Sequence, residues 1–352
     1  MLITVLFLIG ELLISSTTHV FDGGSPRRVI IQFAAFAAGM AAMPLVRYVD
    51  YMDFKKFYKL FYAVGIISLL LVYVPGLGSV QGGARGWIKL GKINVQPIEI
   101  AKLTFIISYA VYLDENAGKL NTIDQIAKAL VMPIPILVLL VLQPDLGGAI
   151  VFMCITFGML FFAGINLRIV TNALIISVLL FPLIYSYGLN LLMPYQADRI
   201  RDFFSFENGS GSDHALKSAI AIVSGGLTGK GPFKGDQHRF GFLPVSESDF
   251  IFAVAGEEYG IIGMGIIIAL YGLFLTKLLK IAFSSRDMYG SLIVMGITSL
   301  FIYQFIQNVG MTIGLMPVTG LTLPFMSYGG SSMIMSMAEI FIVQCVAIRR
   351  RY

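Results

Sequence analysis

The stretch Asp249-Phe-Ile-Phe-Ala-Val-Ala-Gly-Glu-Glu-Tyr-Gly260 opens an apolar run that continues to residue 282. A helix needs about 20 apolar residues to cross the hydrocarbon core of a bilayer, and this run is long enough. The acidic residue at its start would stand where water meets the membrane. An ionisable group in such a place costs free energy and tends to mark a functional site. The stretch therefore predicts a membrane helix with a candidate site at its entrance.

The composition extends this prediction to the whole chain. Of the 352 residues, 57% are hydrophobic and 13% are charged, and the mean hydropathy is +0.82. Such values are not those of a soluble domain, and the apolar runs lack the alternation of a membrane β-barrel. We expect an all-α fold, a polytopic membrane helical bundle that forms a single integral membrane domain over residues 1–352.

Apolar runs of suitable length predict about ten transmembrane helices and one large extracytoplasmic loop, residues 191–249. The pair 129–145 and 147–163 is expected to form two short spans joined by a tight turn, although one re-entrant unit would fit the same pattern. The predicted spans cover residues 1–20, 29–46, 57–75, 97–113, 129–145, 147–163, 169–190, 250–282, 289–313 and 331–349.

The distribution of Lys and Arg predicts the orientation. The short loops that would lie inside carry basic clusters such as Lys55-Lys56 and Arg349-Arg350-Arg351, and basic short loops are typical of the cytoplasmic side. Long segments such as 191–249 cross the membrane regardless of their charge, so they do not count. We therefore expect both termini to be cytoplasmic and the site at Asp249 to be extracytoplasmic.

This orientation predicts a basic field around Asp249 on the outer side. Such a field suits an anionic substrate such as a pyrophosphate, whereas the alternative is a set of solvated loop charges. Its members are Arg85, Lys89, Lys92, Lys102, Arg199, Arg201, Lys217, Lys230, Lys234 and Arg239.

Residues 83–102 contain the only Trp of the chain and end in a Glu-x-x-Lys pair. Trp87 suits a membrane interface, where its ring is apolar and its N–H is wet. Pro97 favours a helix start, so Glu99 would lie in the first turn with Lys102 close enough to pair with it. The two charges could bind substrate, or they could simply neutralise each other inside the bilayer.

Three further segments carry candidate residues. Asp145 follows Pro144, a position typical of a turn or a helix N-cap. The Gly-rich residues 225–231, with Lys230, could cradle a phosphate through backbone N–H groups or could form a flexible turn. Residues 308–332 are dense in Gly, Pro and hydroxyls, among them Ser327 and Ser331. Irregular backbone at membrane depth is tolerated where it is buried in protein or lines a cavity.

Several other chemistries lack the residues they need. Cys154 and Cys345 both fall inside predicted spans, and the three His are scattered, so we predict neither a disulfide framework nor a zinc site. The chain has no P-loop and no dinucleotide-binding Gly pattern after a strand. We expect no nucleic-acid partner.

Taken in order, the motifs resemble the SEDS family of bacterial wall synthases, typified by RodA and FtsW. The resemblance runs from about residue 15 to the C-terminus. Two positions depart from the family pattern: Ile98 stands where Ser is usual, and Gly86 separates Arg85 from Trp87 where a second basic residue is common. The motifs that carry the resemblance are residues 83–102, 143–147, 224–231, 243–260 and 308–332.

The resemblance implies a peptidoglycan glycosyltransferase of the bacterial cytoplasmic membrane that polymerises lipid II on the outer face during cell elongation. Asp249 is the expected general base, because the attacking sugar hydroxyl must lose a proton. A divalent cation, Mg²⁺ or Mn²⁺, is compatible with the pyrophosphate, and its site stays open. The implied protein partner is a class B penicillin-binding transpeptidase. The expected substrate-binding residues are Arg85, Glu99, Lys102, Asp145, Arg199, Arg201 and Lys230, with Trp87, Glu257, Ser327 and Ser331 in support.

Alternatives from other classes remain. The chain could be an FtsW-like division paralogue with the same activity, a lipid II flippase or ion-coupled carrier, or a scaffold. Carriers favour ionisable residues at the midplane and broken helices in repeated halves, whereas here the ionisable residues cluster on the outer side and residues 1–175 and 176–352 show no convincing repeat. The enzyme is therefore preferred. For Asp249 itself, the alternative role is a cap of the 250–282 helix.

Overall fold

The computed structural model describes residues 1–21, 26–81, 84–90, 93–166, 168–169, 171–172 and 210–350. Two compact units emerge from the contacts between residues. Unit 1 comprises Met1–Val46, Arg201–Leu278 and Phe301–Ile342, and unit 2 comprises Arg47–Ile200, Leu279–Leu300 and Val343–Tyr352. The predicted single domain over residues 1–352 stays a prediction.

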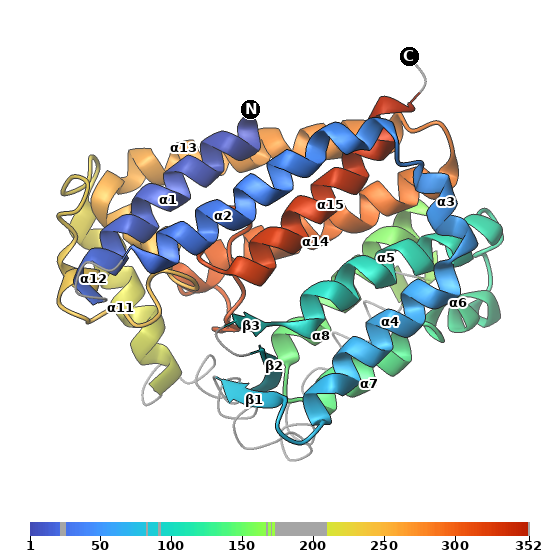
Figure 1. Ribbon diagram of the computed structural model, residues 1–352, viewed down its shortest axis with the longest axis horizontal. Helices are drawn as coiled ribbons and strands as arrows, with labels where there is room; N and C mark the ends of the chain where they lie inside the picture. The colour runs from blue at the N-terminus through green and yellow to red at the C-terminus, as the bar shows by residue number, and fades with distance from the viewer. Residues whose placement is uncertain are drawn as a thin grey trace. The chain divides into compact units, whose positions relative to one another are not determined.

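Unit 1 is a bundle of helices (Figure 1), and buried aromatic rings lie in its core. Its core includes Phe274, Phe301 and Phe325, whose ring centroids lie 5.5–5.6 Å apart. Rings at these separations contribute attraction beyond the area they bury. Its helices are α1 (Leu2–Phe21), α2 (Arg27–Ala42), α11 (Ser210–Gly225), α12 (Asp236–Arg239), most of α13 (Ile251–Phe283), and parts of α14 (Met288–Thr312) and α15 (Gly330–Ile348).

Helix α13 is interrupted at Gly260, whose φ of 67° and ψ of −170° are not helical. In a continuous helix the carbonyls of Glu257 and Glu258 would accept from the N–H groups of residues 261 and 262. Here the 225–231 loop supplies the two donors instead. The N–H groups of Lys230 and Gly231 donate to these two carbonyls, both at 3.0 Å. The loop also accepts from α13, because Ile261 N donates to Gly226 O at 3.0 Å and Ile262 N to Leu227 O at 3.2 Å.

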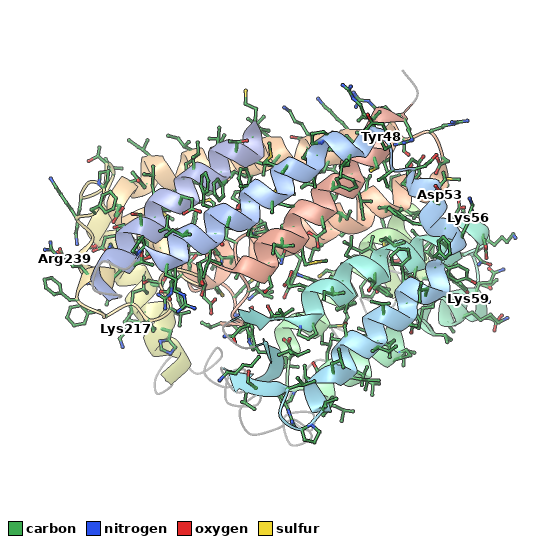
Figure 2. The ribbon with its side chains drawn as sticks, in the orientation of Figure 1. Tyr48, Asp53, Lys56, Lys59, Lys217 and Arg239 are labelled. Carbon is green, nitrogen blue, oxygen red and sulfur yellow. The ribbon has the colours of Figure 1, made fainter. Side chains whose placement is uncertain are left out.

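Unit 2 is a second set of helices, and α5 is its most buried element. Pro97 is at the start of α5, as the sequence predicts, and Phe105 packs on Phe152 of α8 with 5.3 Å between ring centroids. Asp53, Lys56 and Lys59 lie at the end of this unit that holds α3 (Figure 2). Its helices are α3 (Tyr51–Lys56), α4 (Tyr58–Leu70) with the 3₁₀ turn η2 (Leu71–Tyr73), α5 (Pro97–Glu115), α6 (Ile123–Leu130), α7 (Pro133–Leu142) and α8 (Leu146–Phe162).

A small antiparallel sheet, which the sequence analysis did not predict, lies in unit 2 at the opposite end of α4 from α3 (Figure 1). Its strands are β1 (Gly78–Gln81), β2 (Ala84–Leu90) and β3 (Ile93–Val95), in the order β1-β2-β3. The register pairs Ser79 with Trp87 and Gln81 with Ala84. The Gly-Gly pair between Gln81 and Ala84 is a recognised hairpin signal, and Trp and Ile favour strands. The apolar runs predict spans on either side of residues 76–96, at 57–75 and 97–113, and no strand between them.

The long apolar helices coincide with the predicted runs, whereas α3, most of α6, α11 and α12 lie outside them, the last two within the predicted loop 191–249. The span predicted at 169–190 lies for most of its length outside the described residues. The pair 129–145 and 147–163 holds separate helices, α7 and α8, joined by a turn at Gln143–Asp145. Within the described residues, four helices are long and apolar enough to cross a membrane, and a fifth qualifies if α6 and α7, bent by 51°, are one span. Helices α1, α4 and α8 are apolar but shorter. The chain is thus a multi-pass helical membrane protein.

Candidate functional site

Asp249 lies directly before α13 in unit 1, where the loop that follows α12 turns into the helix. Its side chain is half-buried, and its Oδ1 accepts a hydrogen bond of 2.9 Å from the Ser248 hydroxyl. A Cβ built at Gly320 would lie 3.3 Å from Asp249 Oδ2, so the other oxygen faces the 313–329 segment. Gly320 has a φ of +71°, a conformation that glycine adopts without strain. The carboxylate is therefore held between two loops and keeps part of its surface accessible.

Ser327 lies in the 313–329 segment that faces Asp249, and Ser331 follows that segment in α15. The Ser327 hydroxyl donates to the Ser248 carbonyl at 2.5 Å and accepts from Leu323 N at 2.8 Å. Ser331 lies in the first turn of α15 and is half-buried. Ser327 therefore bonds the residue next to Asp249, and the supporting roles of both serines stay predictions.

Glu257 is fully buried and completely engaged. Its Oε1 accepts from Lys230 Nζ at 2.8 Å and from the backbone N–H groups of Asp236 at 2.7 Å and Gln237 at 3.0 Å. His238 lies against the same carboxylate, with Nδ1 3.6 Å from Glu257 Oε2. Glu257 thus joins α12 and the Gly-rich loop to α13, and its supporting role in the site stays a prediction.

Lys230 sits between two carboxylates, Glu257 and Asp236, with its Nζ 2.8 Å and 2.9 Å from them. Burial alone would lower the pKa of Lys230, but its hydrogen bonds to Glu257 and Asp236, together with their charges, raise the pKa above its ordinary value. The ammonium stays protonated, and much of its charge is already neutralised within unit 1. Its predicted contact with substrate stays a prediction.

The N–H groups of Gly229, Lys230 and Gly231 in the Gly-rich loop donate to carbonyls of the protein itself. A phosphate cradle would need these donors, whereas Gly229 N donates to Gly225 O at 2.9 Å and the next two N–H groups complete the ladder of α13. The turn interpretation therefore describes residues 225–231 better than the cradle interpretation does.

Glu99 and Lys102 form a buried ion pair at the start of α5 in unit 2. Lys102 Nζ lies 2.8 Å from Glu99 Oε1, and the side chains are only 3% and 9% exposed. Taking two charges out of water is expensive, and their attraction offsets that cost only when the geometry is good. The pairing predicted from the Glu-x-x-Lys spacing is confirmed, and whether the pair also binds substrate stays a prediction.

Arg85, Trp87 and Asp145 lie on the sheet and on the turn beside it. Arg85 N donates to Gln143 O at 3.3 Å, and the Arg85 guanidinium lies 5.8 Å from the centroid of the Tyr73 ring. Trp87 is a half-buried residue of β2. Asp145 caps α8, since its Oδ1 accepts from Gly148 N at 2.8 Å, which confirms the N-cap alternative. Unit 2 thus brings Arg85 close to the turn that carries Asp145.

Two expected contacts cannot be placed and one cofactor gains no support. Arg199 and Arg201 lie outside the described residues. Among the residues that the structure describes, no group of three or more His, Cys, Asp or Glu side chains could hold a metal ion. The divalent cation stays a prediction.

Two residues beside Asp249 were not singled out from the sequence. Gln32 of α2 and Asn308 of α14 are both fully buried and both bond the loops around Asp249. Gln32 is the one polar residue between Arg28 and Ala42, and a polar residue in an apolar helix is a usable signal. Its partners lie almost the whole chain away, so the sequence alone could not identify them.

A family model, curated relatives and solved structures all match this chain and indicate the same protein family. The family model described as "Cell cycle protein", which takes in FtsW, RodA and SpoVE, matches residues 1–352. The protein named peptidoglycan glycosyltransferase MrdB from Escherichia coli K12 is 35% identical over 294 residues, 82% of this chain and 78% of that protein. A chain from a peptidoglycan synthase complex that coordinates polymerization and crosslinking superposes with a TM-score of 0.83 at 28% identity, over 99% of this chain and 96% of that one. The rod shape determining protein RodA from Thermus thermophilus gives a TM-score of 0.72 at 27% identity, over 100% and 96%.

Proposed function

We propose, because this chain belongs to the SEDS family of FtsW, RodA and SpoVE, that it is a peptidoglycan glycosyltransferase with Asp249 as its general base. The observation that carries the proposal is the Asp249 carboxylate. It is half-buried at the N-terminal end of α13 and held between two loops of unit 1. A base must be fixed in place within hydrogen-bond reach of the proton it removes. The contacts of Asp249 hold its carboxylate in place.

The substrate is lipid II, a disaccharide pentapeptide carried on undecaprenyl pyrophosphate. The 4-hydroxyl of the acceptor GlcNAc attacks the anomeric carbon of the donor MurNAc. The new glycosidic bond forms as the bond to the pyrophosphate breaks, and undecaprenyl pyrophosphate leaves with the electron pair. Asp249 takes the hydroxyl proton. Negative charge grows on the leaving group, so fixed cations stabilise the transition state.

Cations for the leaving group come from the basic residues of the predicted outer side. Arg85 and Lys102 are the described candidates in unit 2, and Lys230 is the one in unit 1. Each is already close to an aromatic ring or a carboxylate, so we assign them the orientation of the pyrophosphate rather than full neutralisation of its charge. Arg199 and Arg201 keep the same predicted role.

The protein acts on the outer face of the cytoplasmic membrane with a class B penicillin-binding transpeptidase, which crosslinks the strands that it makes. Support for such a partner comes from the fold similarity to a chain of a synthase complex that coordinates polymerization and crosslinking. We assign it to elongation rather than division because Gly229-Lys-Gly231 and Gly235-Asp-Gln237 resemble the RodA branch more than the FtsW branch.

The test is polymerisation of labelled lipid II by the purified protein in vesicles, with and without a class B partner. Glycan ladders that depend on the protein are the expected result. Movement of labelled lipid II between leaflets without any polymer would instead favour the flippase alternative. Rescue of a RodA-depleted strain, and not of an FtsW-depleted one, is expected for the elongation branch.

A further inference from the structure

Three consecutive carbonyls that lead into α13 are each fixed by a donor from a distant part of unit 1. The Glu247 carbonyl accepts from Tyr328 N at 2.9 Å, the Ser248 carbonyl from the Ser327 hydroxyl at 2.5 Å, and the Asp249 carbonyl from Asn308 Nδ2 at 2.8 Å. Such a run of side-chain and loop donors fixes the backbone at a place where the helix ladder has not yet begun.

Asn308 joins the loop that carries Asp249, between α12 and α13, to the 313–329 segment that faces the Asp249 carboxylate. It lies in α14 and is fully buried. Both N–H groups of its amide are used, one on the Asp249 carbonyl and one on the Leu321 carbonyl, each at 2.8 Å. Leu321 follows Gly320, the residue against which Asp249 Oδ2 rests. Asn308 therefore fixes the position of Asp249 relative to the 313–329 segment, which lies against the Asp249 carboxylate.

Gln32 holds the other end of the same loop. Its Nε2 donates to the Ser327 carbonyl at 2.8 Å, and its Oε1 accepts from Gly329 N at 3.1 Å. These two bonds enclose Tyr328, whose N–H holds Glu247, and they fix Ser327, whose hydroxyl holds Ser248. The amide is fully buried, so loss of these partners would leave its polar atoms unsatisfied away from water.

We propose that Asn308 and Gln32 are positioning residues of the glycosyltransferase, which act by aiming the Asp249 carboxylate at the acceptor hydroxyl. The inference rests on the proposed function. Neither side chain touches the carboxylate itself. Both act through the backbone of residues 247–249, and through Ser248, whose hydroxyl bonds Asp249 Oδ1.

The test compares kcat and KM for lipid II polymerisation in Asn308→Leu and Gln32→Met, which keep similar volume and remove the hydrogen bonds. Ser218→Ala is the matched control. The fully buried Ser218 hydroxyl likewise donates to one distant carbonyl of unit 1, that of Thr312, at 2.8 Å, and it lies outside the Asp249 loops.

We expect kcat to fall about 10- to 100-fold in both variants, since a small misplacement of a reacting group can cost that much, with KM changed less than about twofold. Ser218→Ala, at a similar loss of thermal stability, keeps its kcat. If Asn308→Leu does not fold, Gln32→Met and the milder Gln32→Glu, which keeps the acceptor for Gly329 N, carry the test. Equal kcat losses in these variants and in Ser218→Ala, or a change in KM alone, would overturn the inference.

Asp249→Asn in the same assay separates the two proposals. If Asp249→Asn is inactive while the Asn308 and Gln32 variants behave like the control, only the positioning inference is wrong. If Asp249→Asn polymerises like the wild type, the base role is wrong and the positioning inference is wrong with it.

Discussion

At the scale of single residues, Asp249 and Glu257 show how two nearby carboxylates take different roles. Glu257 is fully buried, and its oxygens are shared among Lys230 and two backbone N–H groups. Asp249 is half-buried and its oxygens face a hydroxyl and a glycine. A carboxylate saturated by donors is a poor base because its charged form is the one stabilised. The surroundings of Glu257 therefore support an anchoring role for it, whereas the base role proposed for Asp249 rests on the position of that half-buried carboxylate just before α13.

The buried pair of Glu99 and Lys102 gives a testable prediction at this scale. Lys102→Met should destabilise the protein by about 3–5 kcal/mol, because it leaves the Glu99 charge buried without its partner. The double variant Glu99→Gln with Lys102→Met should regain most of that stability. Thermal unfolding in detergent measures both.

Activity separates the two roles of this pair. If Lys102 also binds the pyrophosphate, the double variant stays without polymerisation although it is folded, and this is the outcome we expect. A double variant that is both stable and active would mean that the pair only neutralises two buried charges.

At the scale of elements, the interruption of α13 is what joins the Gly-rich loop to the helix. Residues 261–283 alone are about 35 Å long at 1.5 Å per residue, more than the hydrocarbon core of about 30 Å, so the helix can still span a bilayer despite the break. It gives the loop two carbonyls and two N–H groups to bind. The sequence predicts the span and its length well, but only the glycines hint that it is broken.

Gly260→Ala tests the joint. A Cβ at residue 260 would meet Gly229 N and the Leu227 carbonyl, and its φ of +67° disfavours any side chain. Backbone with this φ and a ψ of −170° is essentially restricted to glycine and costs another residue about 1–3 kcal/mol, and the clash adds to it. Gly265→Ala is the matched control, since no atom of the protein lies within 4 Å of a Cβ there.

Thermal unfolding in detergent should show a clear loss of stability for Gly260→Ala. The control should be unchanged or up to about 1 kcal/mol more stable, because alanine is the better helix former. Equal stability of the two variants would contradict the role given to the break.

At the scale of the whole molecule, the length of the apolar runs was enough to locate the long membrane helices, because each apolar run must be buried in lipid or protein. The shorter helices α3, α11 and α12 lie outside the predicted spans. Local signals also held where one residue decides the structure, as Pro97 does at the start of α5 and Asp145 at the start of α8. The bonds of Gln32 and Asn308 were out of reach, because they join residues far apart in the chain through single amides. The sheet in unit 2 was missed because its strands have only 4, 7 and 3 residues, whereas the prediction rested on apolar runs long enough to cross a bilayer.

The predicted orientation can be tested on intact cells with a membrane-impermeant maleimide. Arg239 and Lys56 are exposed, and Figure 2 shows the first at α12 in unit 1 and the second at α3 in unit 2. In a parent with Cys154→Ala and Cys345→Ala, Arg239→Cys should be labelled from outside and Lys56→Cys only after lysis. The reverse pattern would invert the topology and put Asp249 on the wrong side for wall synthesis.

The central claim is that Asp249 removes the proton from the attacking sugar hydroxyl. Asp249→Asn tests it most directly, because Asn caps a helix about as well as Asp and yet cannot act as a base. We predict that the purified variant folds and unfolds like the wild type but makes no glycan ladder from labelled lipid II, with or without a class B partner. Ladders equal to those of the wild type would contradict the account.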